Sequence, residues 1–317
     1  MTMEKLRIVF LGTPEFAVGI LDAILKNKYE VVGVITAADK PAGRGQNIKY
    51  SAVKEYALEH NLTLLQPANL KDEAFLSELK SLNANLQVVV AFRMLPEAVW
   101  KMPKLGTFNL HASLLPNYRG AAPINWAIIN GETKTGVTTF FIDDKIDTGA
   151  MILSNVIEIA PDENAGALHE RLMSLGCQTV IETLYLIENG KAKTTIQKEN
   201  EDIKTAYKLN KANCKIDWTK SAAEIHNLIR GLSPYPCSWS VFKDKNEAWD
   251  VKIYESKIST EEHNYAIGKI VASKKELKVA VKDGFVQILS LQFSGKKKMN
   301  ANELLNGVNF TEQAQAE

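Results

Sequence analysis

The first 190 residues of this chain alternate between short apolar segments and amphipathic helical patterns. The helical patterns end near Asn27, His60 and Leu82. Four apolar segments between them have the length of strands, namely Leu6–Leu11, Val31–Thr36, Leu62–Gln66 and Leu86–Phe92. Because strands without polar alternation are buried on both faces, this order is typical of a mostly parallel sheet that helices cover on both sides. The pattern therefore predicts an α/β fold for this region.

Signals at the helix ends support this assignment. Ser51 precedes a helical pattern and is expected to cap its first turn. Pro123 is expected at the first position of another helix, because a missing N–H costs nothing there. A long helix is predicted over Ala165–Asn189, with Gly190 just past its end. The remaining strands of this region are predicted at Thr107–Leu110, Gly136–Ile142 and Ala150–Ile159.

The pattern changes after residue 190. Residues 191–212 show little apolar periodicity and several lysines, and we expect a basic linker there. A helix is predicted over Ala222–Leu232, and the last ten residues are expected to fray. Five short segments rich in β-branched and aromatic residues predict a small β-barrel within residues 213–317: Cys237–Phe242, Trp249–Tyr254, Ile267–Ala272, Leu277–Val281 and Phe285–Phe293.

Charge is distributed unevenly along the chain. Residues 1–190 carry 17 Lys and Arg against 21 Asp and Glu, and residues 191–317 carry 21 against 16. The resulting net charges are −4 and +5. A positive second half is typical of a polyanion partner, although a solvated, lysine-rich surface would give the same count.

Three cysteines without a CxxC pair argue against a disulfide framework and against a metal site. The apolar run Ile8–Leu11 is too short for the core of a signal peptide. No apolar segment approaches the roughly 20 residues that a membrane span requires. We therefore expect a cytoplasmic protein without a membrane partner.

The densest group of reactive side chains lies between residues 109 and 147. Asn109 and His111 are two residues apart on a predicted strand, so their side chains point to the same face. Asp147 lies in the predicted loop Asp143–Gly149. An amide, an imidazole and a carboxylate that converge can act as oxyanion donor, proton carrier and orienting group. Taken singly, His111 also fits a hydrogen-bonded structural residue, and Asp147 a turn residue.

Longer motifs connect these residues. Asn109-x-His111 is followed by Ser-Leu-Leu-Pro-x-Tyr-Arg-Gly-Ala-Ala-Pro at residues 113–123 and by Asp-x-x-x-Asp-Thr-Gly at residues 143–149. This combination resembles the folate-dependent formyltransferases, and in particular the branch that acts on methionyl-tRNA. The resemblance runs along nearly the whole chain, through Arg7–Phe16, Lys40–Gly45, Ile216–Trp218 and Ile229–Pro236.

The resemblance implies a Rossmann-like formyltransferase domain over residues 1–190, and an OB-fold-like, tRNA-binding domain over residues 213–317. It implies 10-formyltetrahydrofolate as formyl donor, the α-amine of initiator methionyl-tRNA as acceptor, and no metal or protein partner. The implied catalytic residues are Asn109, His111 and Asp147. The implied folate-binding residues are Phe92, Ser113, Leu114, Leu115, Pro116, Asp143 and Asp144. The implied tRNA-binding residues are Lys40, Arg44, Lys49, Lys204, Lys208 and Lys211.

The chain departs from the family pattern beside the expected pterin site. It reads Ala91-Phe92-Arg93-Met94 before Leu-Pro, where the family commonly has Ala-Tyr-Gly. Ala112 also stands where a glycine often follows the histidine. These differences bear on the folate contacts and not on the reaction.

Three other functions stay open on the sequence alone. Two keep the same chemistry: a formyltransferase that acts on a nucleotide-linked amino sugar, and a hydrolase that releases formate from 10-formyltetrahydrofolate. The third is a nucleotide- or RNA-binding module without catalysis. The basic loop Lys40–Gly45 favours tRNA over a sugar nucleotide, and the three candidate catalytic residues favour an enzyme. No GxGxxG follows the first strand, so a dinucleotide site is not supported.

Overall fold

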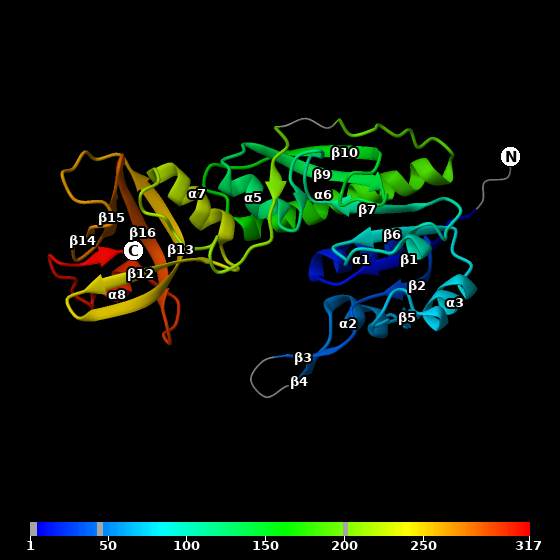
Figure 1. The fold of residues 1–317 in the computed structure, drawn as a ribbon, viewed down its shortest axis with the longest axis horizontal. Helices are drawn as coiled ribbons and strands as arrows, with labels where there is room; N and C mark the ends of the chain where they lie inside the picture. Colours follow the sequence, from blue (N-terminus) through cyan, green and yellow to red (C-terminus); the bar gives the residue numbers. More distant parts are fainter. Residues whose placement is uncertain (1–4, 43–46, 199–201) are drawn as a thin grey trace. The chain divides into compact units, whose positions relative to one another are not determined.

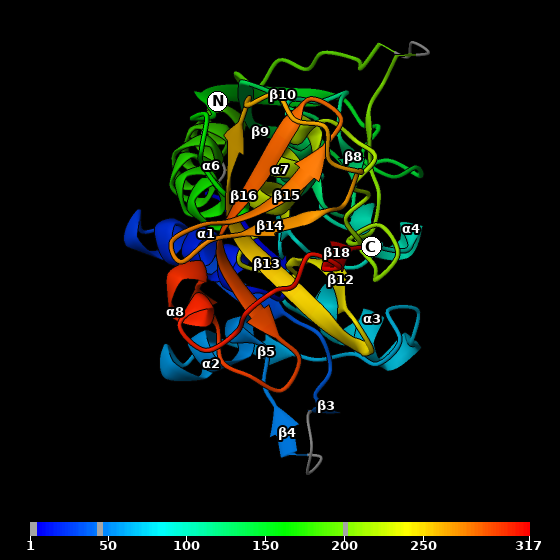
Figure 2. The same cartoon turned by 90° about the vertical axis from the view of Figure 1, so that its left-hand side faces the viewer.

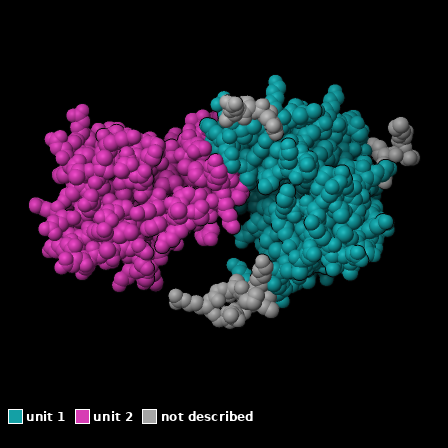
Figure 3. Space-filling model, viewed as in Figure 1, with its two compact units in different colours: residues 1–120, 136–157, 169–205 teal, residues 121–135, 158–168, 206–317 magenta. Residues whose placement is uncertain are grey.

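The computed structural model describes residues 5–42, 47–198 and 202–317. The chain forms two compact units (Figure 3). Unit 1 consists of residues 1–120, 136–157 and 169–205, and unit 2 of residues 121–135, 158–168 and 206–317. Unit 2 therefore contains the helix α5 (Pro123–Ile129), although this helix belongs to the first half of the sequence.

Unit 1 is built on a seven-stranded sheet in the order β10-β9-β7-β6-β1-β2-β5 (Figure 1). β1 pairs in parallel with β2 and β6, β2 with β5, and β6 with β7. β9 is antiparallel to β7. The predicted, mostly parallel α/β sheet is thus confirmed. Its strands are β1 (Arg7–Gly12), β2 (Glu30–Ile35), β5 (Leu64–Leu65), β6 (Leu86–Val90), β7 (Thr107–His111), β9 (Lys134–Phe141) and β10 (Met151–Glu158).

Helices cover the two faces of this sheet, and the alternation along each strand decides which residues they meet. Val9, Leu11 and Val89 belong to the apolar cluster that includes α3. Leu110 points to the other face, where it lies against Gly176 of α6. Asn109 and His111, its neighbours on β7, therefore point to the α3 face. The helices are α1 (Glu15–Lys26), α2 (Ala52–Glu59), α3 (Glu73–Ser81), α4 (Glu97–Trp100) and α6 (Ala165–Glu188).

The predicted signals at helix ends are confirmed. The Ser51 hydroxyl accepts a hydrogen bond of 3.1 Å from the Lys54 N–H at the start of α2. Pro123 begins α5. Gly190 follows α6 with φ of +62°, and the next N–H bonds back to the Leu186 carbonyl at 2.8 Å. A glycine adopts this left-handed conformation without the strain that a Cβ would add.

Unit 2 carries a curved antiparallel sheet in the order β14-β15-β16-β13-β12-β18 (Figure 2), and α7 and α8 contribute residues to its apolar core. The Ile270 N–H donates to the Ala314 carbonyl and the Ala316 N–H to the Gly268 carbonyl, so the last strand also reaches the β14 edge. The predicted small β-barrel is confirmed. Its elements are α7 (Ala222–Leu232), β12 (Ser238–Asp244), β13 (Glu247–Ser259), β14 (Ile270–Ala272), β15 (Leu277–Val281), β16 (Gly284–Phe293), β17 (Met299–Asn300), α8 (Ala301–Leu305) and β18 (Gln315–Ala316).

The prediction that the last ten residues fray is wrong. Ala314 and Ala316 are 0% and 3% exposed, and β18 pairs with β12. Two open sheet edges present unpaired N–H and C=O groups, and the C-terminal segment pairs with both of them. Alanine carries too weak an apolar signal for the sequence to reveal this strand.

Two short strand pairs were not expected from the sequence. β3 (Lys40–Ala42) and β4 (Asn47–Lys49) form a hairpin inside the long loop after β2. β8 (Arg119–Gly120) pairs with β11 (Thr205–Ala206), which brings the segment after β7 beside the segment predicted as a linker. Two- and three-residue strands are too short to produce a periodic pattern.

Candidate active site

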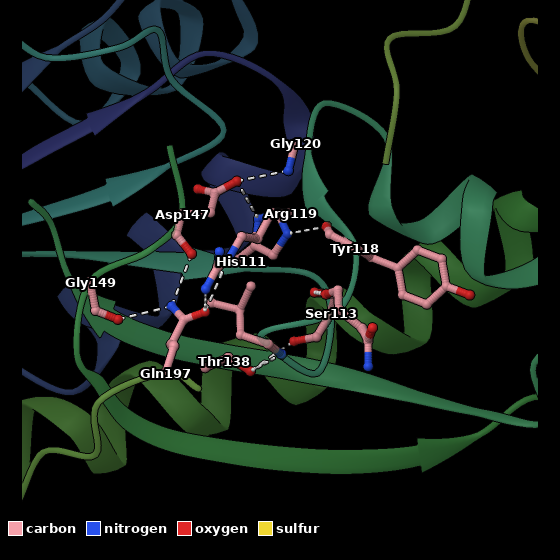
Figure 4. A network of polar contacts seen from close by, with 11 residues as sticks. His111, Ser113, Tyr118, Arg119, Gly120, Thr138, Asp147, Gly149 and Gln197 are labelled. Atoms are coloured by element: carbon pink, nitrogen blue, oxygen red, sulfur yellow. Dashed lines mark hydrogen bonds and ion pairs between the residues drawn. The ribbon is translucent and has the colours of Figure 1, made fainter. Parts of the chain in front are cut away.

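His111 lies at the end of β7 and is 6% exposed. Its Nε2 is 2.7 Å from the Tyr118 carbonyl oxygen, and its Nδ1 is 3.7 Å from Oδ2 of Asp147 (Figure 4). Each ring nitrogen thus faces an oxygen atom. A carbonyl oxygen only accepts hydrogen bonds, so Nε2 of His111 carries a hydrogen and donates it to Tyr118, while Nδ1 faces the Asp147 carboxylate.

Asp147 is held in the loop between β9 and β10. Since β9 is antiparallel to β7, this loop starts beside Thr107, whose carbonyl accepts from the Ile142 N–H at 2.9 Å. The loop then turns back to His111, and Oδ2 of Asp147 accepts from the Gly120 N–H at 2.9 Å. Asp147 has φ of +56°, a conformation that costs a non-glycine residue free energy and often marks functional loops.

Gln197 fixes the Asp147 loop from a distant part of the chain, and no sequence motif marks it. Its side chain is buried, and its Nε2 donates to the carbonyls of Asp147 and Gly149, at 2.9 Å each. Its Oε1 accepts from Nε and Nη2 of Arg119, at 3.1 and 2.8 Å (Figure 4). Partners 48 to 78 positions away leave no periodic signal, so only the fold reveals this residue.

Asn109 is half-buried on the strand face that also carries His111. Within residues 5–42, 47–198 and 202–317, no group forms a hydrogen bond with the Asn109 side-chain amide. Its two N–H groups are therefore available to a ligand. Asn109, His111 and Asp147 thus supply a free amide, a buried imidazole and a fixed carboxylate around one face of β7.

The segment after β7 is fixed by its own hydrogen bonds. Ser113 is fully buried, and its hydroxyl donates to the Asn117 carbonyl at 2.7 Å. The Thr138 hydroxyl donates to the Ser113 carbonyl at 2.8 Å. Leu115 is buried, whereas Leu114 and Pro116 are half-buried. The Ser113 hydroxyl is therefore engaged by the chain, and it is the backbone and apolar side chains of this segment that can meet a ligand.

The remaining predicted folate residues occupy different surroundings. Phe92 is half-buried and packs against the apolar cluster of the α3 face. The neighbouring Arg93 donates from Nη1 to the Ala68 carbonyl at 3.1 Å, so it ties the loops after β5 and β6 together. Oδ1 of Asp143 accepts from the Lys145 N–H and the Thr148 hydroxyl, which shapes the Asp147 loop, and Asp144 is exposed.

The predicted RNA-binding residues are spread over both units. Lys49 ends β4 opposite Lys40 of β3, and the Lys40 side chain and all of Arg44 lie outside the described part of the chain. The base of this hairpin is anchored by an ion pair between Lys54 and Asp39. Bonds from Lys54, and then from Gln66, lower the pKa of the Asp39 carboxyl. The other predicted lysines, Lys204, Lys208 and Lys211, are exposed.

Neither a metal site nor a membrane-spanning helix is present among the described residues. They contain no group of three or more His, Cys, Asp or Glu side chains placed to hold a metal ion. No helix in the described ranges is both long and apolar enough to cross a membrane.

Sequence comparison finds the family described as "Formyl transferase" at residues 6–184 and "Formyl transferase, C-terminal domain" at residues 208–309. The methionyl-tRNA formyltransferase of Flavobacterium johnsoniae is 74% identical over 312 residues, which cover 98% of this chain and 99% of the relative. The methionyl-tRNA formyltransferase of Bacteroides fragilis is 54% identical over 317 residues, which cover 98% of each.

Solved structures share the fold at lower identity. A sugar 3N-formyl transferase, WlaRD, solved in the presence of dTDP and 5-N-formyl-THF, matches with a TM-score of 0.66 and 24% identity, over 93% of this chain and 100% of that chain. HypX from Aquifex aeolicus, in complex with tetrahydrofolic acid, matches with a TM-score of 0.64 and 18% identity, over 97% of this chain and 49% of that chain. At these identities the likeness concerns the fold alone.

Proposed function

The chain belongs to the formyl transferase family, and from this we propose that it transfers the formyl group of 10-formyltetrahydrofolate to the α-amino group of initiator methionyl-tRNA. Relatives named methionyl-tRNA formyltransferase match it from end to end. The observation in the structure that carries the proposal is the arrangement of Asn109, His111 and Asp147 around one strand face, with the Asn109 amide free.

Asn109 and His111 stabilise the charge that develops during transfer. Attack of the amine on the formyl carbon turns the carbonyl oxygen into an oxyanion. The free N–H groups of the Asn109 amide donate to this oxygen, and the imidazole of His111, on the same strand face, is the second polar group beside it. Donors that are already in place when the charge appears require no reorganisation, which is why such groups accelerate acyl transfer.

The reaction also moves protons. The α-amino nitrogen loses a proton as the new C–N bond forms, and the departing folate nitrogen gains one as the old C–N bond breaks. His111 is the proton carrier for this exchange. Asp147, 3.7 Å from Nδ1 of His111, orients the ring, and its own position is set by the Gly120 N–H and by Gln197.

The folate lies along the segments that the family motif marks. Phe92 and the apolar residues Leu114, Leu115 and Pro116 supply contacts for a pterin ring, and the backbone of Ser113 and of the Asp143–Asp144 turn supplies polar groups. Arg93 stands where the family commonly has a glycine, and its guanidinium is engaged by the Ala68 carbonyl.

The acceptor tRNA contacts two groups of basic residues. The first is Lys40, Arg44 and Lys49, in the long loop after β2, and the second is Lys204, Lys208 and Lys211, in the segment 191–212. We assign catalysis to residues 1–190, a basic linker to residues 191–212 and tRNA binding to residues 213–317. Formylated methionyl-tRNA starts translation, so the protein works in the cytoplasm.

Formyl transfer is tested by mixing the protein with 10-formyltetrahydrofolate and each of four acceptors: initiator methionyl-tRNA, elongator methionyl-tRNA, an amino-sugar nucleotide and water. We expect product with initiator methionyl-tRNA, and its loss in His111→Ala and Asp147→Ala. Transfer to the sugar alone, or release of formate alone, would leave the roles of Asn109, His111 and Asp147 intact and overturn the tRNA assignment.

A further inference from the structure

A large cavity lies wholly within unit 2, and of the residues that line it only Lys208 and Lys211 were assigned a role above. Its volume is about 810 Å³, which falls in the range of small-molecule sites. α5 borders it through Asn125, and the segment after the predicted linker through Lys208–Lys211. β12, β13 and β16 supply the rest of its wall, including Cys237, Trp239, Asp250–Lys252 and Gln292–Gly295.

The charge around this cavity is positive. Lys208, Lys211 and Lys252 line it, against the single carboxylate of Asp250. In the part of the chain that the structure describes, none of these three lysines has a carboxylate partner. Ammonium groups without a carboxylate partner at the edge of a cavity attract an anion, and phosphate is the anion that RNA carries on every nucleotide.

Aromatic rings line the same cavity. Tyr235 is 83% exposed although it is a large apolar ring. The indole of Trp239 is fixed by a hydrogen bond of 2.7 Å from its Nε1 to the Lys211 carbonyl. The Lys211 ammonium lies over that ring, 4.9 Å from its centroid, so a cation and a flat apolar surface adjoin each other. A nucleotide has the matching halves, a phosphate and a flat base.

The polar side chains of the wall have little capacity left to read a base. Asn210 accepts from the Ala212 N–H at 2.9 Å, and Gln292 accepts from the Tyr254 hydroxyl and donates to the Lys296 carbonyl. Buried Val251, Phe293, Cys214 and Cys237 add an apolar floor. These surroundings favour a base that is held by stacking and burial, whatever its identity, over one that is recognised by hydrogen bonds.

We propose that this cavity binds one unpaired nucleotide of the acceptor RNA, with its base against Tyr235 and Trp239 and its phosphate against Lys211 and Lys252. That the RNA is the acceptor tRNA rests on the function proposed above. That the site takes a base and a phosphate rests on the residues that line the cavity. A base within a duplex is stacked on both sides, so only a single-stranded stretch or an extruded base can enter.

The test measures binding of the full-length protein to four probes: a short single-stranded RNA, a duplex of the same sequence, AMP and inorganic phosphate. Tyr235→Ala should weaken binding of the single strand on the order of 10-fold and leave the duplex unchanged, because stacking on one ring is lost. The double variant Lys211→Ala, Lys252→Ala should weaken binding of the single strand by at least as much and reduce the salt dependence of that binding. Lys257→Ala, also an exposed lysine of β13 but outside the cavity, is the matched control.

Steady-state formyl transfer separates this proposal from the function that it refines. We expect a higher KM for methionyl-tRNA in the cavity variants, with kcat and the KM for folate unchanged. If the wild type is active and the cavity variants bind RNA and react as it does, the proposed nucleotide site is overturned and the proposed function is not. Loss of single-strand binding in a protein without formyl transfer would support the cavity and overturn the function. AMP that binds as tightly as the RNA strand would overturn the assignment to RNA.

Discussion

The molecule contains two pairs of a buried histidine and an aspartate, one in each unit. In unit 1, Nδ1 of His111 lies 3.7 Å from Asp147, and in unit 2, Nε2 of His226 lies 3.5 Å from Asp162. Both histidine side chains are at most 10% exposed, and each has a further oxygen at its other ring nitrogen. By distance and burial of the ring alone, the two pairs look alike.

The surroundings of the two carboxylates separate them. The Asp147 side chain is 15% exposed and is held by the Gly120 N–H, whereas the Asp162 side chain is 94% exposed. His226 also stands beside the Arg230 cation, while His111 shares its strand face with a free amide, Asn109. A histidine–aspartate pair therefore indicates chemistry only where the carboxylate is fixed and a further polar group lies unused.

The largest expected difference is between the two histidines. His111→Gln should lower kcat for formyl transfer on the order of 10³-fold, because the proton carrier of the reaction is lost. His226→Gln should leave kcat within about twofold of the wild type. Single-turnover formylation of methionyl-tRNA by the two variants checks this, and equal losses would show that His111 is structural too.

The amides beside the histidines give the second contrast. Asn109→Ala should lower kcat about 10²–10³-fold, the usual effect of removing one oxyanion donor. Asn227, whose Oδ1 accepts from Nε of Arg230 at 2.8 Å, is the matched control. Asn227→Ala should change stability and leave kcat unaffected. A normal kcat in Asn109→Ala, with folding intact by circular dichroism, would contradict the proposed role of this amide.

Each aspartate also depends on one side chain that fixes its loop, and this gives the third contrast. Gln197 holds the carbonyls of Asp147 and Gly149, and Nη1 of Arg230 donates to the Glu163 carbonyl at 3.0 Å beside Asp162. Gln197→Ala should lower kcat by roughly 10–100-fold, since small displacements of catalytic groups are costly. Arg230→Ala should lower only the melting temperature. An effect of Gln197→Ala on melting temperature without one on kcat would show that Gln197 supports the fold and not the site.

The parts of the candidate site that follow one another along the chain can be predicted from the sequence. The spacing of Asn109 and His111 placed both on one face, and the family motif added Asp147. Gln197 lies in a segment whose low apolar periodicity predicts a linker, so no local signal marks it. The surroundings of His226 and His111 cannot be told apart from the sequence either, since the exposure of a carboxylate depends on the packing of distant segments.

The fold, too, was predictable where its signals are local and not where it depends on distant segments. Buried strands and capped helices were predicted because apolar runs, Ser51 and Gly190 are local signals. The closing strand β18 was missed because its inward residues are alanines, and because its pairing partners, β12 and the β14 edge, are far away in the sequence. Local chemistry determines where elements begin and end, whereas edge pairing depends on which edges the rest of the fold leaves open.

The smallest expected effect concerns the dependence of stability on pH. Burial, and then the Arg230 cation, lower the pKa of His226 from its ordinary value of 6.5, and Asp162 only partly opposes them. The unfolded chain therefore binds a proton at His226 more readily than the folded chain does. The contribution of His226 to stability is complete above about pH 6.5 and decreases as the pH falls below that value.

Urea unfolding between pH 5 and 8 should show this decrease in the wild type and a flatter profile in His226→Gln. Because the same substitution at His111 should lower kcat on the order of 10³-fold, the pH profile of stability and the rate of transfer together assign one histidine to the fold and the other to the reaction. A profile as steep in His226→Gln as in the wild type would place the titrating group elsewhere.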